Sequence, residues 1–195
     1  MKVVVRLVDR LIQDGAVEEE DREIYEYGFN QGIVMLINIL CTILIGLCMG
    51  MLLEVLVFMA TYIPLRTFGG GFHAKTQVRC FIYSNLLVVG ILLLSRFIAH
   101  SSIAYLILGL LGTIVVMRMA PVEDKNKPLD EIECRVYGKK ARCILGLDLL
   151  LAIALQLLGF HNLVSTVLVS VFALGVFLIM GYVKNVRIDK YGLES

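Results

Sequence analysis

Long apolar segments separated by short polar breaks are the feature that most constrains the fold of this 195-residue chain. A helix needs about 20 apolar residues, and at least about 17, to cross the hydrocarbon core of a bilayer. Hydrophobic residues make up 58% of the sequence, above the roughly 45–50% that is typical of soluble domains. We therefore predict an all-α polytopic membrane protein with about six transmembrane helices, at 28–49, 50–65, 80–96, 102–119, 143–158 and 162–183.

The second of these segments, 50–65, is ambiguous. Glu54 lies inside it and Pro64 is expected to end it. Proline removes a backbone donor and disrupts the preceding turn of a helix. This segment is therefore either a short or tilted span or a partly re-entrant one.

The N-terminal segment, 1–27, carries many charges and lacks the apolar core of a cleavable signal peptide. Apolar residues within 2–13 recur at helical spacing on one side. This pattern predicts an amphipathic helix that either lies on the membrane surface or packs against the bundle. We treat 1–195 as one integral membrane domain, with a cytoplasmic N-terminal segment, a bundle over 28–183 and a cytoplasmic tail over 184–195.

Basic residues are distributed unevenly between the two sides of the predicted bundle. If the N-terminus is inside, all but one of the 18 Lys and Arg residues fall on inner segments, and only Arg96 lies outside. An excess of cations on the inner loops sets the orientation of a membrane protein. We therefore predict that both termini and the polar segment 66–80 face the cytoplasm. The formal net charge of +1 argues against nucleic acid as a partner.

The polar segment 66–80 interrupts the apolar sequence and carries the residues best suited to chemistry. These are Arg66, Gly69, Gly70, Gly71, His73 and Cys80. A thiol near an imidazole is the arrangement of a cysteine nucleophile with its base. In one straight helix the two would be separated by about 10.5 Å of rise, too far for direct proton transfer. We therefore predict that residues 66–75 fold back as a non-helical loop, which glycines permit, and that the third span starts near Thr76.

Other interpretations of the same residues stay open. A cysteine at the end of a membrane helix is often a small packing residue or a lipid attachment site, and an interfacial histidine is often a polar tip that reaches water. The sequence does not identify a third catalytic residue, although four polar residues are near: Thr76, Gln77, Ser84 and Asn85. The cysteines form no CxxC pair and the histidines are scattered, so we expect neither a disulfide framework nor a metal site, and no cofactor.

Arg66, the Gly-Gly-Gly-Phe-His73 stretch and Cys80 resemble the signature of the AgrB-like accessory gene regulator family. The segment 120–129 is similar to the loop that follows the fourth span in that family. The resemblance covers essentially the whole chain. It implies a bacterial membrane cysteine endopeptidase that processes a short quorum-sensing pro-peptide of the AgrD type. His73 and Cys80 then match the catalytic pair of the family, and Arg66 and the glycines match positions that support activity.

The resemblance also implies a reaction sequence. Cys80 cleaves the C-terminal tail from the pro-peptide and keeps the remainder as a thioester, which an internal thiol or hydroxyl converts into a cyclic thiolactone or lactone. The acidic tail would meet basic residues on the inner side, namely Lys125, Lys127, Lys139 and Lys140. The same cations are also what membrane topology requires, and they could equally attract anionic membrane lipid.

Two other classes of function compete with the protease. Glu54, Asp148, Gln156 and His161 are polar groups in or beside predicted spans, and such groups often mark a transport path. A membrane peptide transporter or exporter without proteolytic chemistry is therefore the main alternative. The other is a membrane scaffold in which Cys80 carries a lipid. A homodimer is plausible for a small six-span protein, but no feature of the sequence requires one.

Overall fold

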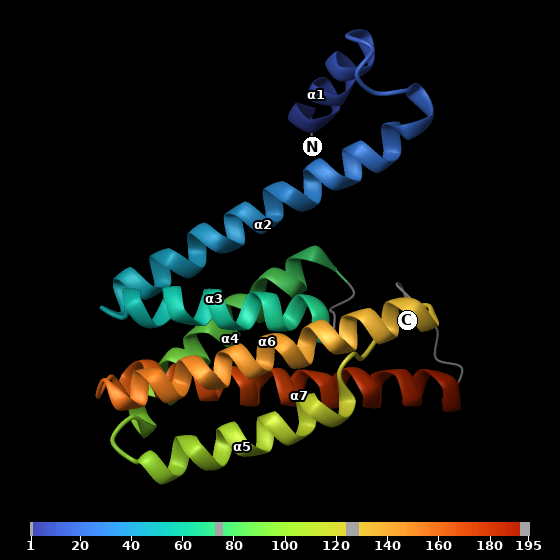
Figure 1. Cartoon of the computed structure of the whole chain (residues 1–195). Coiled ribbons are helices and arrows are strands. Elements are labelled where there is room, and N and C mark those ends of the chain that lie inside the picture. Colours follow the sequence, from blue (N-terminus) through green and yellow to red (C-terminus); the bar gives the residue numbers. More distant parts are fainter. Residues whose placement is uncertain (1, 73–75, 124–128, 192–195) are drawn as a thin grey trace. The chain divides into compact units, whose positions relative to one another are not determined.

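The computed structural model describes residues 2–72, 76–123 and 129–191, and these residues are almost entirely helical (Figure 1). The described residues contain seven α-helices and one short 3-10 turn at Glu19–Asp21. The prediction of an all-α membrane protein is confirmed. The helices are α1 (Lys2–Gln13), α2 (Arg22–Cys48), α3 (Leu52–Gly69), α4 (Gln77–Ile98), α5 (Ser102–Met119), α6 (Glu131–Leu157) and α7 (His161–Tyr191).

The chain divides into two compact units, Met1–Thr42 and Ile43–Ser195, which we describe separately. In the first unit α1 is the amphipathic helix expected from the sequence, with Val4 and Val8 buried. The Arg22 guanidinium at the start of α2 contacts the Asp9 carboxylate of α1, which ties these two helices together. Whether α1 lies on the membrane surface or packs against the bundle stays a prediction. The single integral membrane domain also stays a prediction.

Five helices are long and apolar enough to cross a membrane, within the part of the chain that is described: α2 with the preceding turn, α3, α4, α5 and α7. This composition fits a multi-pass membrane protein. The remaining predicted span, 143–158, forms the second half of α6. This helix is not among the five, since even its last 18 residues include three charged ones, Lys140, Arg142 and Asp148.

The prediction that Pro64 ends the second span is wrong, because α3 continues through Pro64 to Gly69. Proline removes one intrahelical hydrogen bond, which costs an isolated helix about 3 kcal/mol. In this chain α3 packs against both α6 and α7, and such tertiary packing is the main source of helix stability in proteins. The extra turn places Arg66 and Gly69 on a helix rather than in a loop.

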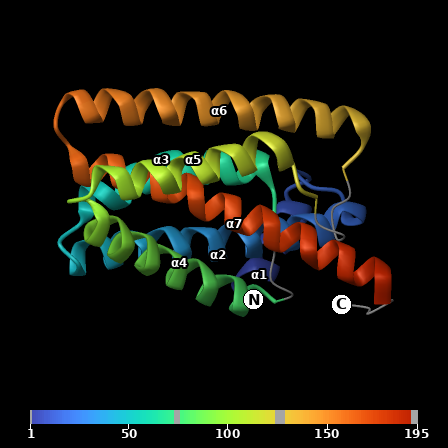
Figure 2. The ribbon, with the colours of Figure 1, turned by 90° about the horizontal axis from the view of Figure 1, so that it is seen from below.

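In the second unit α7 is the central helix and packs against α3, α4, α5 and α6 (Figure 2). Its closest partner is α5, and small residues allow the close approach. A Cβ atom on Gly112 would lie 2.5 Å from the Phe172 Cα, so only glycine fits there.

This bundle has two ends. We call the end that holds residues 70–72 and 122 the loop end, and the end that holds the turns at 99–101 and 158–160 the opposite end.

A hydrogen-bonded tyrosine joins three helices at the opposite end. The Tyr105 side chain is fully buried, and its hydroxyl donates to Gln156 Oε1 at 3.0 Å. The Tyr105 hydroxyl oxygen also lies 3.1 Å from Ser102 Oγ and 3.5 Å from His161 Nδ1. The network therefore links the starts of α5 and α7 to the end of α6.

Tyr105→Phe is expected to destabilise the folded protein by about 1 kcal/mol, since it removes this hydrogen bonding without changing ring packing. Denaturant unfolding in mixed micelles measures the change. Tyr27→Phe is the matched control, because the Tyr27 side chain is 68% exposed and its hydroxyl should contribute little. Equal stability of the two variants would contradict a structural role for the network.

Candidate functional site

The glycine loop, Gly70–Phe72, leaves the end of α3 in a conformation that favours glycine. Gly70 and Gly71 have φ angles of 71° and 107°, which L side chains rarely adopt. The Gly70 N–H donates to the Arg66 carbonyl at 3.0 Å and closes the last turn of the helix. The prediction that the loop begins at residue 66 is therefore wrong, because residues 66–69 are helical and the chain leaves the helix only at Gly70.

Backbone hydrogen bonds attach the glycine loop to two distant segments. The Gly71 N–H donates to the Val122 carbonyl at 2.9 Å, and the Val122 N–H donates to the Gly69 carbonyl at 3.0 Å. The Phe72 N–H donates to the Phe177 carbonyl of α7 at 3.0 Å. The two motifs that the sequence presents separately, around residues 70 and 122, are thus paired side by side, and both lie against α7.

The Arg66 side chain binds the backbone of the glycine loop. Its guanidinium donates to the Gly70 and Phe72 carbonyls and lies over the Phe177 ring, with 5.5 Å from Cζ to the ring centroid. A planar guanidinium can bond two acceptors in a fixed geometry and stack on an aromatic ring at the same time. The predicted supporting role of Arg66 therefore has a specific physical form, which is to fix the backbone on both sides of Gly71.

Cys80 lies in the first turn of α4, close to the glycine loop. Thr76 is the N-cap residue of this helix, and its hydroxyl accepts a hydrogen bond from the Arg79 N–H at 3.3 Å. The prediction that the third span starts near Thr76 is confirmed. All five cysteines lie in described residues and are free thiols, and Cys80 is exposed.

A pocket of about 140 Å³ adjoins Cys80. Phe72 of the glycine loop contributes to this pocket, as do residues of α3, α4 and α7. Among the described residues, the lining consists of Tyr62, Arg66, Phe72, Cys80, Tyr83, Ser84, Leu87 and Phe177. Of the predicted site residues, the structure thus brings Arg66 and Cys80 to one cavity.

His73 lies outside the described residues, so its distance from Cys80 stays a prediction. Among the polar residues considered as a third catalytic group, Ser84 lines the pocket one turn after Cys80. Thr76 serves as the helix cap, and Asn85 Nδ2 donates to the Phe81 carbonyl at 2.8 Å. Within residues 2–72, 76–123 and 129–191, no three His, Cys, Asp or Glu side chains lie close enough together to hold a metal ion.

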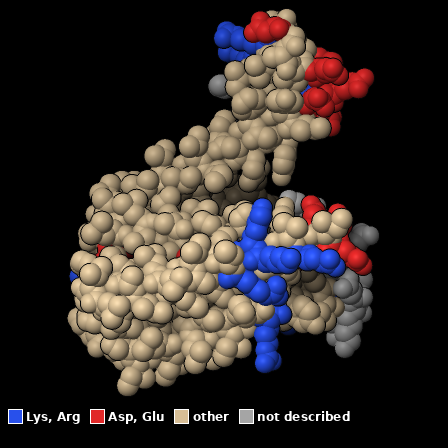
Figure 3. Space-filling model, viewed as in Figure 1, with Lys and Arg blue, Asp and Glu red and all other residues tan. Residues whose placement is uncertain are grey.

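Basic side chains gather on one face over the first half of α6 (Figure 3). Lys139 and Lys140 are exposed there, and Lys140 Nζ lies 4.9 Å from the centroid of the Phe68 ring at the end of α3. On α7, Lys184 Nζ lies 5.5 Å from the centroid of the Phe72 ring. Lys125 and Lys127 lie outside the described residues. Substrate binding by any of these lysines stays a prediction.

Three residues that support the glycine loop could not be recognised from the sequence: Val122, Phe177 and Gly181. Val122 contributes its backbone N–H and carbonyl, which carry no sequence signal, and Phe177 contributes its carbonyl and the ring under Arg66, which looks like an ordinary apolar residue of a membrane helix. Gly181 allows the loop to approach α7, because a Cβ atom on it would lie 2.8 Å from both Gly71 C and Phe72 N. A lone glycine in an apolar helix does not by itself indicate that a loop packs against it.

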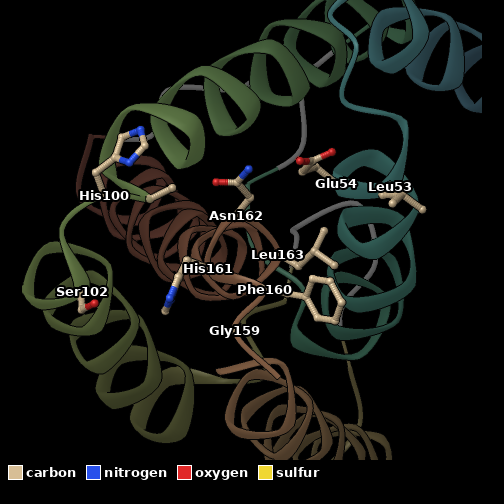
Figure 4. A pocket seen from close by; sticks show the side chains of 10 residues that line it. Leu53, Glu54, His100, Ser102, Gly159, Phe160, His161, Asn162 and Leu163 are labelled. Carbon is tan, nitrogen blue, oxygen red and sulfur yellow. The ribbon is translucent and has the colours of Figure 1, made fainter. Parts of the chain in front are cut away.

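A second pocket, of about 650 Å³, lies at the opposite end of the bundle (Figure 4). Glu54 of α3, His100 of the turn after α4 and Asn162 of α7 line it together with apolar side chains. Of the polar residues that suggested transport, Glu54 and His161 both reach this pocket. Asp148 is instead buried on α6, and its Oδ2 atom has no hydrogen-bond partner in the part of the chain that the structure describes.

Comparisons with known proteins show the family of this chain. The family described as Accessory gene regulator B matches residues 4–182. The chain belongs to this family. The match includes both the glycine loop and Cys80, and membership is consistent with a role in the agr quorum-sensing system.

Curated relatives carry the same family name at moderate identity. An AgrB-like protein of Clostridium perfringens is 30% identical over 79% of this chain and 77% of its own length. AgrB-like protein 2 of the same species is 30% identical over 57% of this chain and 56% of its own. Accessory gene regulator protein B of Staphylococcus intermedius is 31% identical over 56% of this chain and 57% of its own. The match thus spans little more than half of the last two relatives. No solved structure matches the chain.

Proposed function

We propose that this chain is a membrane cysteine endopeptidase that removes the tail of a short pro-peptide and closes the remaining peptide into a ring. Cys80 is the nucleophile, and His73 is its base and proton donor. The observation that supports this pairing is that Phe72, the residue before His73, lines the same pocket as Cys80. The proposal places His73 at this pocket as the residue bonded directly to Phe72.

The first chemical step is cleavage of the peptide bond. Cys80 Sγ forms a bond to the scissile carbonyl carbon, and the bond from that carbon to nitrogen breaks. His73 takes the thiol proton and gives it to the leaving amine, which departs with the tail. The remaining peptide stays on Cys80 as a thioester.

The second step closes the ring. A thiol or hydroxyl of the same peptide attacks the thioester carbonyl, its proton passes to the Cys80 sulfur, and the cyclic thiolactone or lactone leaves. A nucleophile held beside the thioester reacts as an effectively unimolecular partner. This advantage of the internal nucleophile favours cyclisation over hydrolysis at the exposed Cys80.

The glycine loop serves as the positioning element in this scheme. Arg66, Val122 and α7 fix the backbone up to Phe72, while Thr76 fixes the start of the helix that carries Cys80. The two reacting groups are thus attached to separate, anchored segments. Lys139 and Lys140 lie on the first half of α6, where they can attract the acidic tail of the pro-peptide. We propose the same role for Lys125 and Lys127. The site faces the cytoplasm in this scheme.

Processing in liposomes tests the proposal. The substrate is a candidate pro-peptide with an amphipathic start, a central Cys or Ser and an acidic end, and mass spectrometry follows tail release and ring formation. Cys80→Ser is expected to abolish both, and His73→Ala to slow cleavage by about a hundredfold or more. Cys143→Ser is the matched control, since Cys143 is another exposed free thiol on a helix, and it should process normally. Undiminished processing by Cys80→Ser would remove the nucleophile and with it the proposal.

Peptide export is the second candidate function, and the pocket of about 650 Å³ at the opposite end is the observation that favours it. An exporter would move the peptide across the liposome membrane without any covalent change. The same experiment therefore separates the two functions when the luminal and external peptides are analysed for both mass and location.

A further inference from the structure

We propose that the pocket beside Cys80 binds one side chain of the substrate, that of the residue that supplies the scissile carbonyl, and that this side chain is an aromatic ring or a large aliphatic group. The inference rests on the proposed protease function and adds a preference for the residue at the cleavage point. It follows from the walls, the size and the orientation of the pocket.

The walls of the pocket are mainly apolar and come from four parts of the fold. Tyr62, Tyr83, Leu87 and Phe177 line it from α3, α4 and α7. Phe72 adds a further ring from the glycine loop, with ring centroids 6.5 Å from both Tyr83 and Phe177. Aromatic pairs favour centroid separations of about 4.5–7 Å in tilted or edge-on arrangements, so Phe72 already packs in this way on both rings, and together they offer aromatic walls to an entering ring.

The volume of about 140 Å³ fits one such group. An apolar protein cavity of about 150 Å³ is large enough to hold a benzene molecule. A single water molecule needs only about 10–15 Å³ of comparable volume, so this pocket has room for much more than one water molecule. One aromatic or branched aliphatic side chain would fill it.

Among the described residues, Arg66 is the one charged side chain in the lining, and its terminal nitrogens are engaged. Both terminal nitrogens bond backbone carbonyls of the glycine loop, and the guanidinium packs on the Phe177 ring. An acidic substrate side chain would have to compete with these bonds, and it would lose its hydration in an otherwise apolar space. The pocket therefore favours an apolar occupant over a carboxylate.

The pocket is also aligned with the nucleophile. Cys80, Ser84 and Leu87 lie on one face of α4, four and then three residues apart, and all three line the pocket. A side chain inserted along this face places its own carbonyl carbon at the Cys80 end. Burying the side chain thus holds the reacting carbonyl beside the sulfur. The free energy of this burial offsets the entropy that is lost when the carbonyl is oriented for attack.

Thiol-directed reagents test the pocket without requiring the natural substrate. Three acetylated aminoacyl chloromethyl ketones, carrying Phe, Gly or Asp side chains, react with the full-length protein in liposomes. Cys80 Sγ displaces chloride and forms a bond to the methylene carbon. Peptide mapping gives the rate at Cys80, and each rate is divided by the rate with free N-acetylcysteine. The Phe reagent is expected to react about tenfold to a hundredfold faster than the Gly reagent, because it buries an apolar ring.

Leu87→Trp should fill the pocket and reduce this preference for Phe to about threefold or less, whereas Leu86→Trp should leave it unchanged. Leu86 is the matched control because its side chain is 63% exposed and does not line the pocket. Iodoacetamide, which is too small to need the pocket, should modify Cys80 at the same rate in all three proteins, which shows that the sulfur keeps its intrinsic reactivity. Thermal unfolding then checks that each variant is folded. Leu87→Phe provides a milder filling variant where the Trp variant does not fold.

The outcomes separate this inference from the proposed function. Equal normalised rates for the Phe and Gly reagents, a faster Asp reagent, or a Phe preference that survives in Leu87→Trp would each overturn the inference. Any of these results could coexist with Cys80-dependent processing of the pro-peptide. The proposed protease function would then still hold. Conversely, processing by Cys80→Ser would overturn the protease function whatever the reagent preferences are.

Discussion

Gly70→Ala is expected to reduce pro-peptide processing by at least about a hundredfold, because it separates the glycine loop from the segment around residue 122. The new Cβ atom would lie 2.1 Å from the Val122 carbonyl oxygen, which is a backbone atom and cannot rotate away. The φ angle of 71° adds backbone strain for any residue with a Cβ. Either the loop or the segment around Val122 must move, and the hydrogen bond from Gly71 to Val122 is lost. Processing in liposomes measures the effect.

Gly159→Ala is the matched control for this variant. Gly159 also has a positive φ angle, 79°, but no atom lies within 4 Å of the position of its Cβ. Alanine at this position introduces the strain without the collision, and it lies at the opposite end of the bundle from Cys80. We expect a small loss of stability and normal processing. Similar processing defects in Gly70→Ala and Gly159→Ala would show that strain alone matters, and that contact with Val122 does not.

Much of the helical architecture could be predicted from the sequence, because apolar segments of membrane length report directly on local structure. The predicted segment 102–119 coincides with α5, and Thr76 is the N-cap of α4 as expected for a polar residue before an apolar run. The end of α3 was mispredicted. Proline lowers local helix stability, but the packing of α3 against α6 and α7 outweighs this cost. The local sequence does not show which helices will pack against α3.

The candidate site was predictable in its residue types and not in its connections. A thiol, an imidazole and a glycine run within one polar segment are visible in the sequence. The pairing of Gly71 with Val122 is not visible, because backbone hydrogen bonds between two non-helical segments leave no side-chain pattern. The role of Arg66 was predictable only through family resemblance, since an arginine at a helix end is also an ordinary interfacial anchor. Its two carbonyl partners become apparent only once the loop has folded back over it.

Gly181→Ala is the second variant with a large expected effect, and it tests the support of the glycine loop from the other side. Gly181 is on α7, where alanine would otherwise be a better helix former by about 1 kcal/mol. Its Cβ atom would lie 2.8 Å from Gly71 C and Phe72 N, so the loop has to move away from α7. The hydrogen bond from the Phe72 N–H to the Phe177 carbonyl would then lengthen. We expect processing to fall by about a hundredfold, as a displacement of about 1 Å near a reacting group can cause.

Gly146→Ala isolates this effect, because no atom lies within 4 Å of the Cβ position on that glycine of α6. It should gain the helix propensity of alanine and keep normal processing. Thermal unfolding distinguishes loop displacement from general damage: Gly181→Ala should remain folded to near the wild-type temperature while its activity falls. Cys80 should still react with iodoacetamide, since α4 does not move. A Gly181→Ala protein that processes the pro-peptide at the wild-type rate would mean that the contact between the glycine loop and α7 does not position His73, and the role that we assign to the loop would have to be abandoned.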